Sequence, residues 1–135
     1  MKKLILCFFF LSAVYGLYAQ ASETEARRAT EEAIAQYQLN HNQAEEMYVI
    51  QARRLRNLSA IETLRASDYP LYLEKKNATR EGMLSSIRRL LKASQLEILE
   101  QQLAERRKQE AALKAKLKDT GATREEIQMA IWDIE

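Results

Sequence analysis

The sequence predicts an all-α protein of four to five amphipathic helices arranged as an extended antiparallel hairpin or bundle. The 135 residues include only three Gly and one Pro, whereas a β-protein needs many residues that form tight turns. Ala, Leu, Glu, Lys, Arg and Gln dominate, and all of these favour helices. The length allows one hydrophobic core. Because the apolar stripes are thin, we expect a lean core or a homodimer that completes it.

Residues 1–21 have the pattern of a secretory signal peptide. Lys2 and Lys3 precede an apolar stretch at residues 4–14, and small residues follow, ending in Ala19-Gln20-Ala21. We expect cleavage after Ala21, with cleavage after Ala19 as the alternative. A retained membrane anchor is the other interpretation, although the apolar stretch is shorter than the roughly 20 residues of a span. Residues 22–135 would then form a single helical domain.

Two capping boxes mark the first two helices of this domain. In each box a polar side chain caps the helix, and a Glu or Gln three residues later reaches back to the cap. Ser22 and Glu25 predict a first helix to about residue 38. Asn40 and Gln43 predict a second helix to about residue 66, with apolar residues at three- and four-residue steps.

Further capping signals mark the later helices. Asp68 can cap a third helix over residues 69–91, and Pro70 fits its first turn because that turn needs no N–H there. A fourth helix follows to about residue 118. Lys92 is a poor cap, so the third and fourth helices could also be continuous. Gly121 suits a left-handed helix end, and Thr123 opens the capping box of a short last helix.

The composition favours binding over catalysis. After removal of residues 1–21 the chain has no Cys, and His41 is its one His. Nucleophilic triads and metal sites need clusters of such groups, and no Gly-rich phosphate loop is present. His41 and Glu45 could make half of a metal site, but no second His or Cys completes it. We therefore expect a non-enzyme without a cofactor.

The charge is nearly balanced overall but unevenly distributed along the chain. Residues 22–52 carry a net −4, residues 53–92 a net +6 and residues 93–135 a net −2. The balanced total gives no reason to expect a nucleic-acid partner. If the second and third helices pack antiparallel, their basic groups could share one surface that attracts acidic or partly unfolded polypeptide. The alternative is that they match the acidic flanks within the molecule. The candidate contact residues are Arg53, Arg54, Arg56, Arg88 and Arg89.

Two short segments resemble the LTxxQ motif of the periplasmic Spy/CpxP stress-protein family. One is Leu39-Asn40-His41-Asn42-Gln43, and the other, 52 residues later, is Leu91-Lys92-Ala93-Ser94-Gln95. Both lie at predicted helix starts, where the Leu would pack inward and the Gln would brace the cap. The resemblance covers roughly residues 35 to 118.

The resemblance implies a small periplasmic helical protein, often a cradle-shaped antiparallel dimer. Spy-like members are ATP-independent chaperones that hold clients on a concave basic and apolar surface, whereas CpxP-like members also restrain an envelope-stress sensor. Related heavy-metal-resistance proteins bind metal, but this chain lacks their His-rich character. We therefore expect partners among unfolded envelope proteins, with an envelope sensor as the alternative.

Overall fold

The computed structural model describes residues 21–134, and within them it contains six helices and no strand. The predicted all-α fold is confirmed. Apart from residue 21, the predicted signal peptide lies outside the described residues. The helices comprise residues 21–37, α2 (His41–Ile61), α3 (Leu64–Ser67), α4 (Tyr69–Leu90), α5 (Ala93–Asp119) and α6 (Arg124–Asp133).

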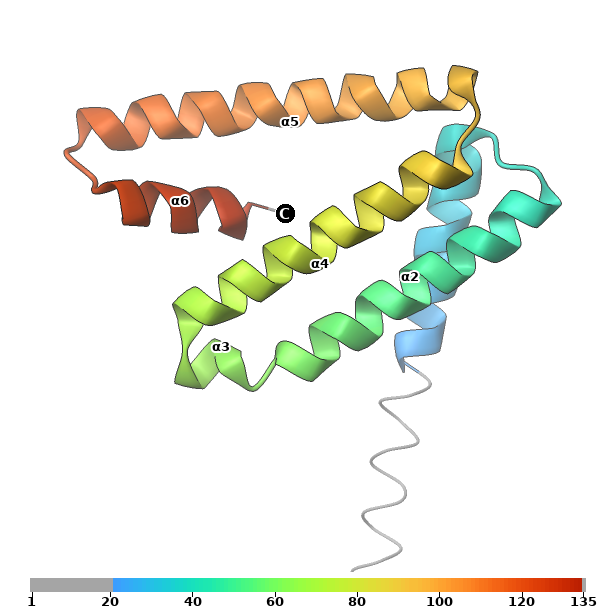
Figure 1. The fold of residues 1–135 in the computed structure, drawn as a ribbon, viewed down its shortest axis with the longest axis horizontal. Coiled ribbons are helices and arrows are strands. Elements are labelled where there is room, and N and C mark those ends of the chain that lie inside the picture. Colours follow the sequence, from blue (N-terminus) through green and yellow to red (C-terminus); the bar gives the residue numbers. More distant parts are fainter. Residues whose placement is uncertain (1–20, 135) are drawn as a thin grey trace, which may run out of the picture.

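The helices form two hairpins and one crossing helix (Figure 1). Helices α2 and α4 run antiparallel and are joined by the short α3, which confirms the predicted antiparallel hairpin. The helix at residues 21–37 crosses this hairpin from behind. Helices α5 and α6 form the second hairpin, and α6 turns back toward α4. None of the helices in residues 21–134 combines the length and apolar character of a membrane span.

Local capping explains where most helices begin. Asn40, Asp68 and Thr123 each accept a hydrogen bond from the backbone N–H three residues later, at 3.0, 3.1 and 3.2 Å. Pro70 lies in the first turn of α4, and Gly121 ends α5 with a φ of 79°. These predictions are confirmed, because each depends on contacts within one turn of the chain.

Two predicted helix limits are wrong. Ser22 is not a cap, because residues 21 and 22 are already helical and Ala21 has a high helix propensity. The second helix stops at Ile61 instead of near residue 66. There the backbone hydrogen bonds change to the i,i+3 pattern of a 3₁₀ turn, and Glu62 N–H donates to Ser59 O at 3.3 Å. The short α3 that follows contacts α4 but has no buried residue.

The third and fourth helices are separate, which decides between the two alternatives that the sequence allowed. Leu91 and Lys92 are both extended, with ψ of 143° and 166°, so the chain leaves α4 and turns before α5 begins. Leu91 itself is buried in the core. From this turn α5 runs back in the direction from which α4 came, at an angle to α4 (Figure 1).

The main core lies where four helices meet. The helix at residues 21–37 contributes a stripe of mostly small buried residues, which lets it approach the hairpin closely. The sequence missed Ala26 and Thr30 in this stripe, and Thr30 satisfies its hydroxyl by donating to Ala26 O at 2.7 Å. The core cluster consists of Ala33, Tyr37, Leu39, Met47, Ile50, Leu84, Ile87, Leu91 and Leu99.

Helix α6 is held mainly by polar contacts near its end. Tyr69 donates a hydrogen bond to Asp133 Oδ1 at 3.1 Å, and Lys76 Nζ lies 3.8 Å from the same carboxylate oxygen. Arg106 donates to the backbone carbonyl of Ile134 at 3.1 Å. Only Ile127 of α6 is buried. Contacts of this kind give α6 low local stability.

We expect Tyr69→Phe to loosen α6, because it removes the hydroxyl that Asp133 accepts from. That hydrogen bond raises the pKa of Tyr69. The contribution of this hydrogen bond to stability is present below the unfolded tyrosine pKa of about 10. It is lost as the pH rises through the higher pKa of the folded state. Acrylamide quenching of Trp132 should increase in the variant at neutral pH, and in the parent protein only at alkaline pH. Tyr48→Phe is the matched control, and equal quenching in all three proteins would contradict the prediction.

Candidate functional site

The two copies of the motif meet at a pair of buried glutamines. Gln43 Nε2 donates to Gln95 Oε1 at 2.8 Å, and Gln95 Nε2 donates back to Gln43 Oε1 at 3.2 Å. The side chains are 52 residues apart in sequence, and both residues are less than a tenth exposed. The spacing between the motifs therefore corresponds to a direct contact.

Each glutamine of the pair also binds backbone groups at helix ends. The Oε1 atom of each accepts from the N–H of its own N-cap residue, at 3.2 Å for Gln43 and 2.9 Å for Gln95. Gln43 Nε2 donates to Leu90 O at 3.0 Å, and Gln95 Nε2 donates to Tyr37 O at 2.9 Å. The pair thus joins the starts of α2 and α5 to the ends of the two preceding helices.

The leucines of the two copies are alike, whereas the capping residues differ. Leu39 and Leu91 are both buried, so the predicted inward packing of both leucines is confirmed. Asn40 forms a complete capping box with Gln43. Lys92 has no acceptor atom, so only the Gln95 half of its box forms. Gln95 is therefore the side chain that braces the start of α5.

Two of the five candidate arginines meet on the α2–α4 hairpin. Arg53 of α2 and Arg89 of α4 both donate to the hydroxyl of Ser86, at 3.0 and 3.3 Å. Ser86 in turn donates to Gly82 O at 3.0 Å. Neither arginine forms an ion pair with a carboxylate in residues 21–134. Two positive charges therefore share one neutral partner.

The five candidate arginines do not form one cluster, although Arg54 lines a cavity together with Arg53 and Arg89. Arg88 pairs with Glu100 of α5 at 3.3 Å. Arg54 is half-buried and lines two further cavities as well. Arg56 is exposed and lines none of the described cavities.

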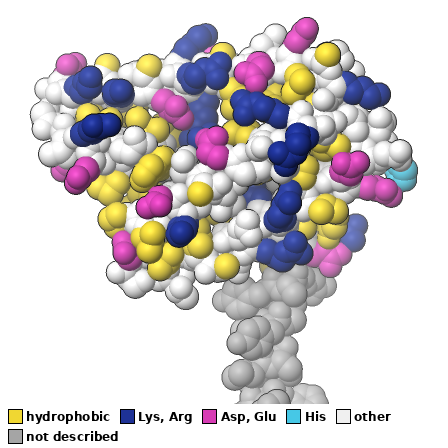
Figure 2. Space-filling view, viewed as in Figure 1, with side chains coloured by type: hydrophobic (Ala, Val, Ile, Leu, Met, Phe, Trp, Pro, Cys, Tyr) yellow, Lys and Arg dark blue, Asp and Glu magenta, His cyan; other side chains and the backbone are white. Residues whose placement is uncertain are grey.

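A shallow groove surrounds Arg53 and Arg89, and we call it the Arg53–Arg89 groove. It consists of two adjoining cavities of about 350 and 300 Å³ that share Ile50, Arg53, Ser86 and Arg89. Leu90 and Val49 line the smaller cavity, and Val49 is 58% exposed. Figure 2 shows Lys and Arg side chains in a row down this face, with apolar side chains beside them. The groove is therefore both basic and apolar.

The described residues contain no group of three or more His, Cys, Asp or Glu side chains placed to hold a metal ion. The predicted half-site exists as a contact, with His41 Nε2 3.4 Å from Glu45 Oε1, and both side chains are more than two-thirds exposed. Such an exposed pair is typical of two neighbours on a helix surface.

Sequence reasoning missed Ser86, which organises the two arginines. The signal was present, because Ser86 follows Met83 by three residues and precedes Leu90 by four, on the apolar face of α4. A serine on such a face needs a hydrogen-bonding partner. Here the partners are two guanidinium groups from different helices.

Comparison with known proteins finds no matching family model, no similar curated protein sequence and no similar solved structure. The fold and the site thus define the chain as an all-α protein with a basic and apolar groove, and the Spy/CpxP resemblance stays a prediction.

Proposed function

We propose that the protein is a periplasmic, ATP-independent holdase that binds unfolded or partly folded polypeptide clients at the Arg53–Arg89 groove. The observation that carries the proposal is the pair of arginines that share Ser86 beside exposed Val49. Uncompensated guanidinium groups attract acidic segments, and adjacent apolar side chains offer contact to exposed hydrophobic residues. Unfolded envelope proteins present both features after secretion.

The charge contacts favour this proposal over complete charge matching within the molecule. Arg88 is matched, because Glu100 lies 3.3 Å away. Arg53 and Arg89 bind a neutral hydroxyl instead, and Glu46 is the one carboxylate that lines the groove. Their charges are therefore available to a partner. A guanidinium group can also bind a carboxylate with two parallel hydrogen bonds.

We expect the Arg53→Gln/Arg89→Gln variant to suppress client aggregation about tenfold less well, which corresponds to about 1.4 kcal/mol of binding free energy. The measurement is light scattering of a reduced, unfolding client at several ratios of protein to client. Arg107→Gln/Lys114→Gln is the matched control, because it removes two exposed positive charges from α5. Failure of the parent protein to suppress aggregation at severalfold excess would refute the proposal.

The alternative is a non-catalytic adaptor that binds one folded envelope partner, such as a sensor protein, at the same groove. A pull-down that yields one stoichiometric partner, without general suppression of aggregation, would favour the adaptor.

The proposed homodimer and periplasmic location have their own tests. Light scattering after size exclusion would measure the mass, and cell fractionation would locate the processed chain.

A further inference from the structure

A second cavity adjoins the Arg53–Arg89 groove and lies between the helix at residues 21–37, α2, α4 and α6. Its volume is about 540 Å³, within the range of small-molecule sites. It is the largest of the described cavities. Its lining combines four cations with apolar and aromatic side chains. The apolar and aromatic members are Leu58, Tyr72, Met83, Trp132 and Ile134.

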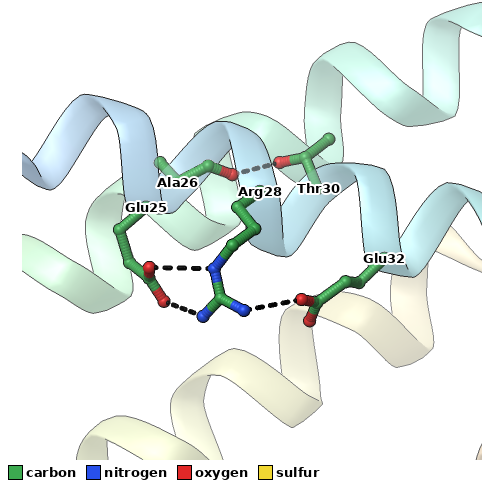
Figure 3. Close-up of polar contacts among 5 residues, drawn as sticks. All are labelled: Glu25, Ala26, Arg28, Thr30 and Glu32. Atoms are coloured by element: carbon green, nitrogen blue, oxygen red, sulfur yellow. Dashed lines mark hydrogen bonds and ion pairs between the residues drawn. The ribbon is translucent and has the colours of Figure 1, made fainter.

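Three of the four cations in the lining are already matched. Arg28 binds Glu25 at 2.7 Å and Glu32 at 2.8 Å, both on its own helix (Figure 3). Arg80 lies 2.7 Å from Glu81, and Lys76 contacts the end of α6. Each of these three cations is therefore already paired with an acidic side chain.

Arg54 is the exception among these four. It is half-buried, and it forms neither a hydrogen bond nor a close ion pair with the rest of residues 21–134. Glu25 shares the cavity, but its carboxylate is held by Arg28, and that hydrogen bond is the main cause of its lowered pKa. Arg54 adds only a weaker electrostatic contribution there. Its guanidinium therefore retains the donors to bind an incoming anion.

The arrangement of charge and apolar surface indicates the ligand class. A carboxylate could bind Arg54 through two parallel hydrogen bonds. A chain attached to it would lie against Leu58, Met83 and the rings of Tyr72 and Trp132. We propose that this cavity binds a fatty-acid-like amphiphile, with its carboxylate on Arg54 and its apolar chain toward Trp132. This cavity adjoins the Arg53–Arg89 groove, because Arg54, Thr79 and Met83 line both. Arg53 and Arg89 do not line it, so their substitution tests the holdase activity without removing the proposed carboxylate contact.

Trp132 makes the proposal directly testable, because it is the only tryptophan in the chain and it lines the cavity. We expect dodecanoate, added below its micelle concentration, to change Trp132 emission saturably in the parent protein. Arg54→Gln should weaken the apparent affinity about tenfold, and Arg54→Lys less, because it keeps the charge and loses the paired donors. Arg56→Gln is the matched control on the same helix and should bind like the parent.

Two comparisons separate a specific site from general hydrophobic binding. Dodecyltrimethylammonium carries the same chain with a positive head group, so it should give at most a weak response. Higher salt should weaken dodecanoate binding to the parent protein. An equal response to both amphiphiles, an unchanged affinity in both Arg54 variants, or no saturable response would overturn the proposal. Circular dichroism of each variant would establish that it is folded.

Discussion

Gln95→Ala is expected to destabilise the protein by about 2–4 kcal/mol, an unusually large effect for a polar side chain. Its amide binds Gln43, the backbone of Lys92 and the carbonyl of Tyr37. Removing one partner of a buried hydrogen bond leaves the other unsatisfied, which costs about 1–3 kcal/mol for each group. Urea unfolding, followed by circular dichroism, would measure the change. Gln101→Ala on the exposed face of α5 is the control and should change stability by less than about 0.5 kcal/mol.

The same prediction can be sharpened with a double-mutant cycle. Gln43→Ala and Gln95→Ala both break the same reciprocal pair, so the double variant should cost less than the sum of the single changes. We expect a coupling of about 1–3 kcal/mol. Additive effects, or a loss of stability below about 1 kcal/mol for both single variants, would show that the Gln43–Gln95 pair is not a major stabilising contact.

Leu99→Ala is expected to destabilise the fold by about 2–5 kcal/mol. Leu99 is 2% exposed and lies in the core cluster, and α5 contributes only Gln95 and Leu99 as buried residues. The cost combines lost apolar burial with the cavity that remains when the neighbours cannot collapse fully. The midpoint of urea unfolding should fall with little change in the slope.

Lys114→Ala is the matched control for Leu99→Ala, since Lys114 is an exposed residue of the same helix. Alanine favours helices at least as well as lysine, so stability should change by less than about 0.5 kcal/mol. A similar small effect for Leu99→Ala would mean that α5 packs against the hairpin only weakly.

Features that depend on a few neighbouring residues could be predicted from the sequence. The caps at Asn40, Asp68 and Thr123 formed as expected, and so did the left-handed turn at Gly121. Each is decided by hydrogen bonds within one turn of the chain. The early end of α2 could not be predicted this way, because residues 62–66 have adequate helix propensity and contain no Gly or Pro that would mark a break.

The candidate sites depended on contacts between distant helices. The sequence placed Arg53, Arg54 and Arg56 in one short basic run. In the structure Arg53 lines the groove with Arg89, Arg54 lines both the groove and the second cavity, and Arg56 is exposed to solvent. Successive helical residues point about 100° apart. Which direction meets a partner depends on how the helices cross.

The amino-acid pattern alone was sufficient for the fold class, the helix starts at Asn40, Asp68 and Thr123, and the two repeated Leu-x-x-x-Gln segments, because these follow from local hydrogen bonding and helix propensity. The contact between Gln43 and Gln95, and the sharing of Ser86 by two arginines, required the folded chain. Helix crossing angles are set by the simultaneous packing of all the apolar stripes. No single stripe, and no motif within one helix, contains that information.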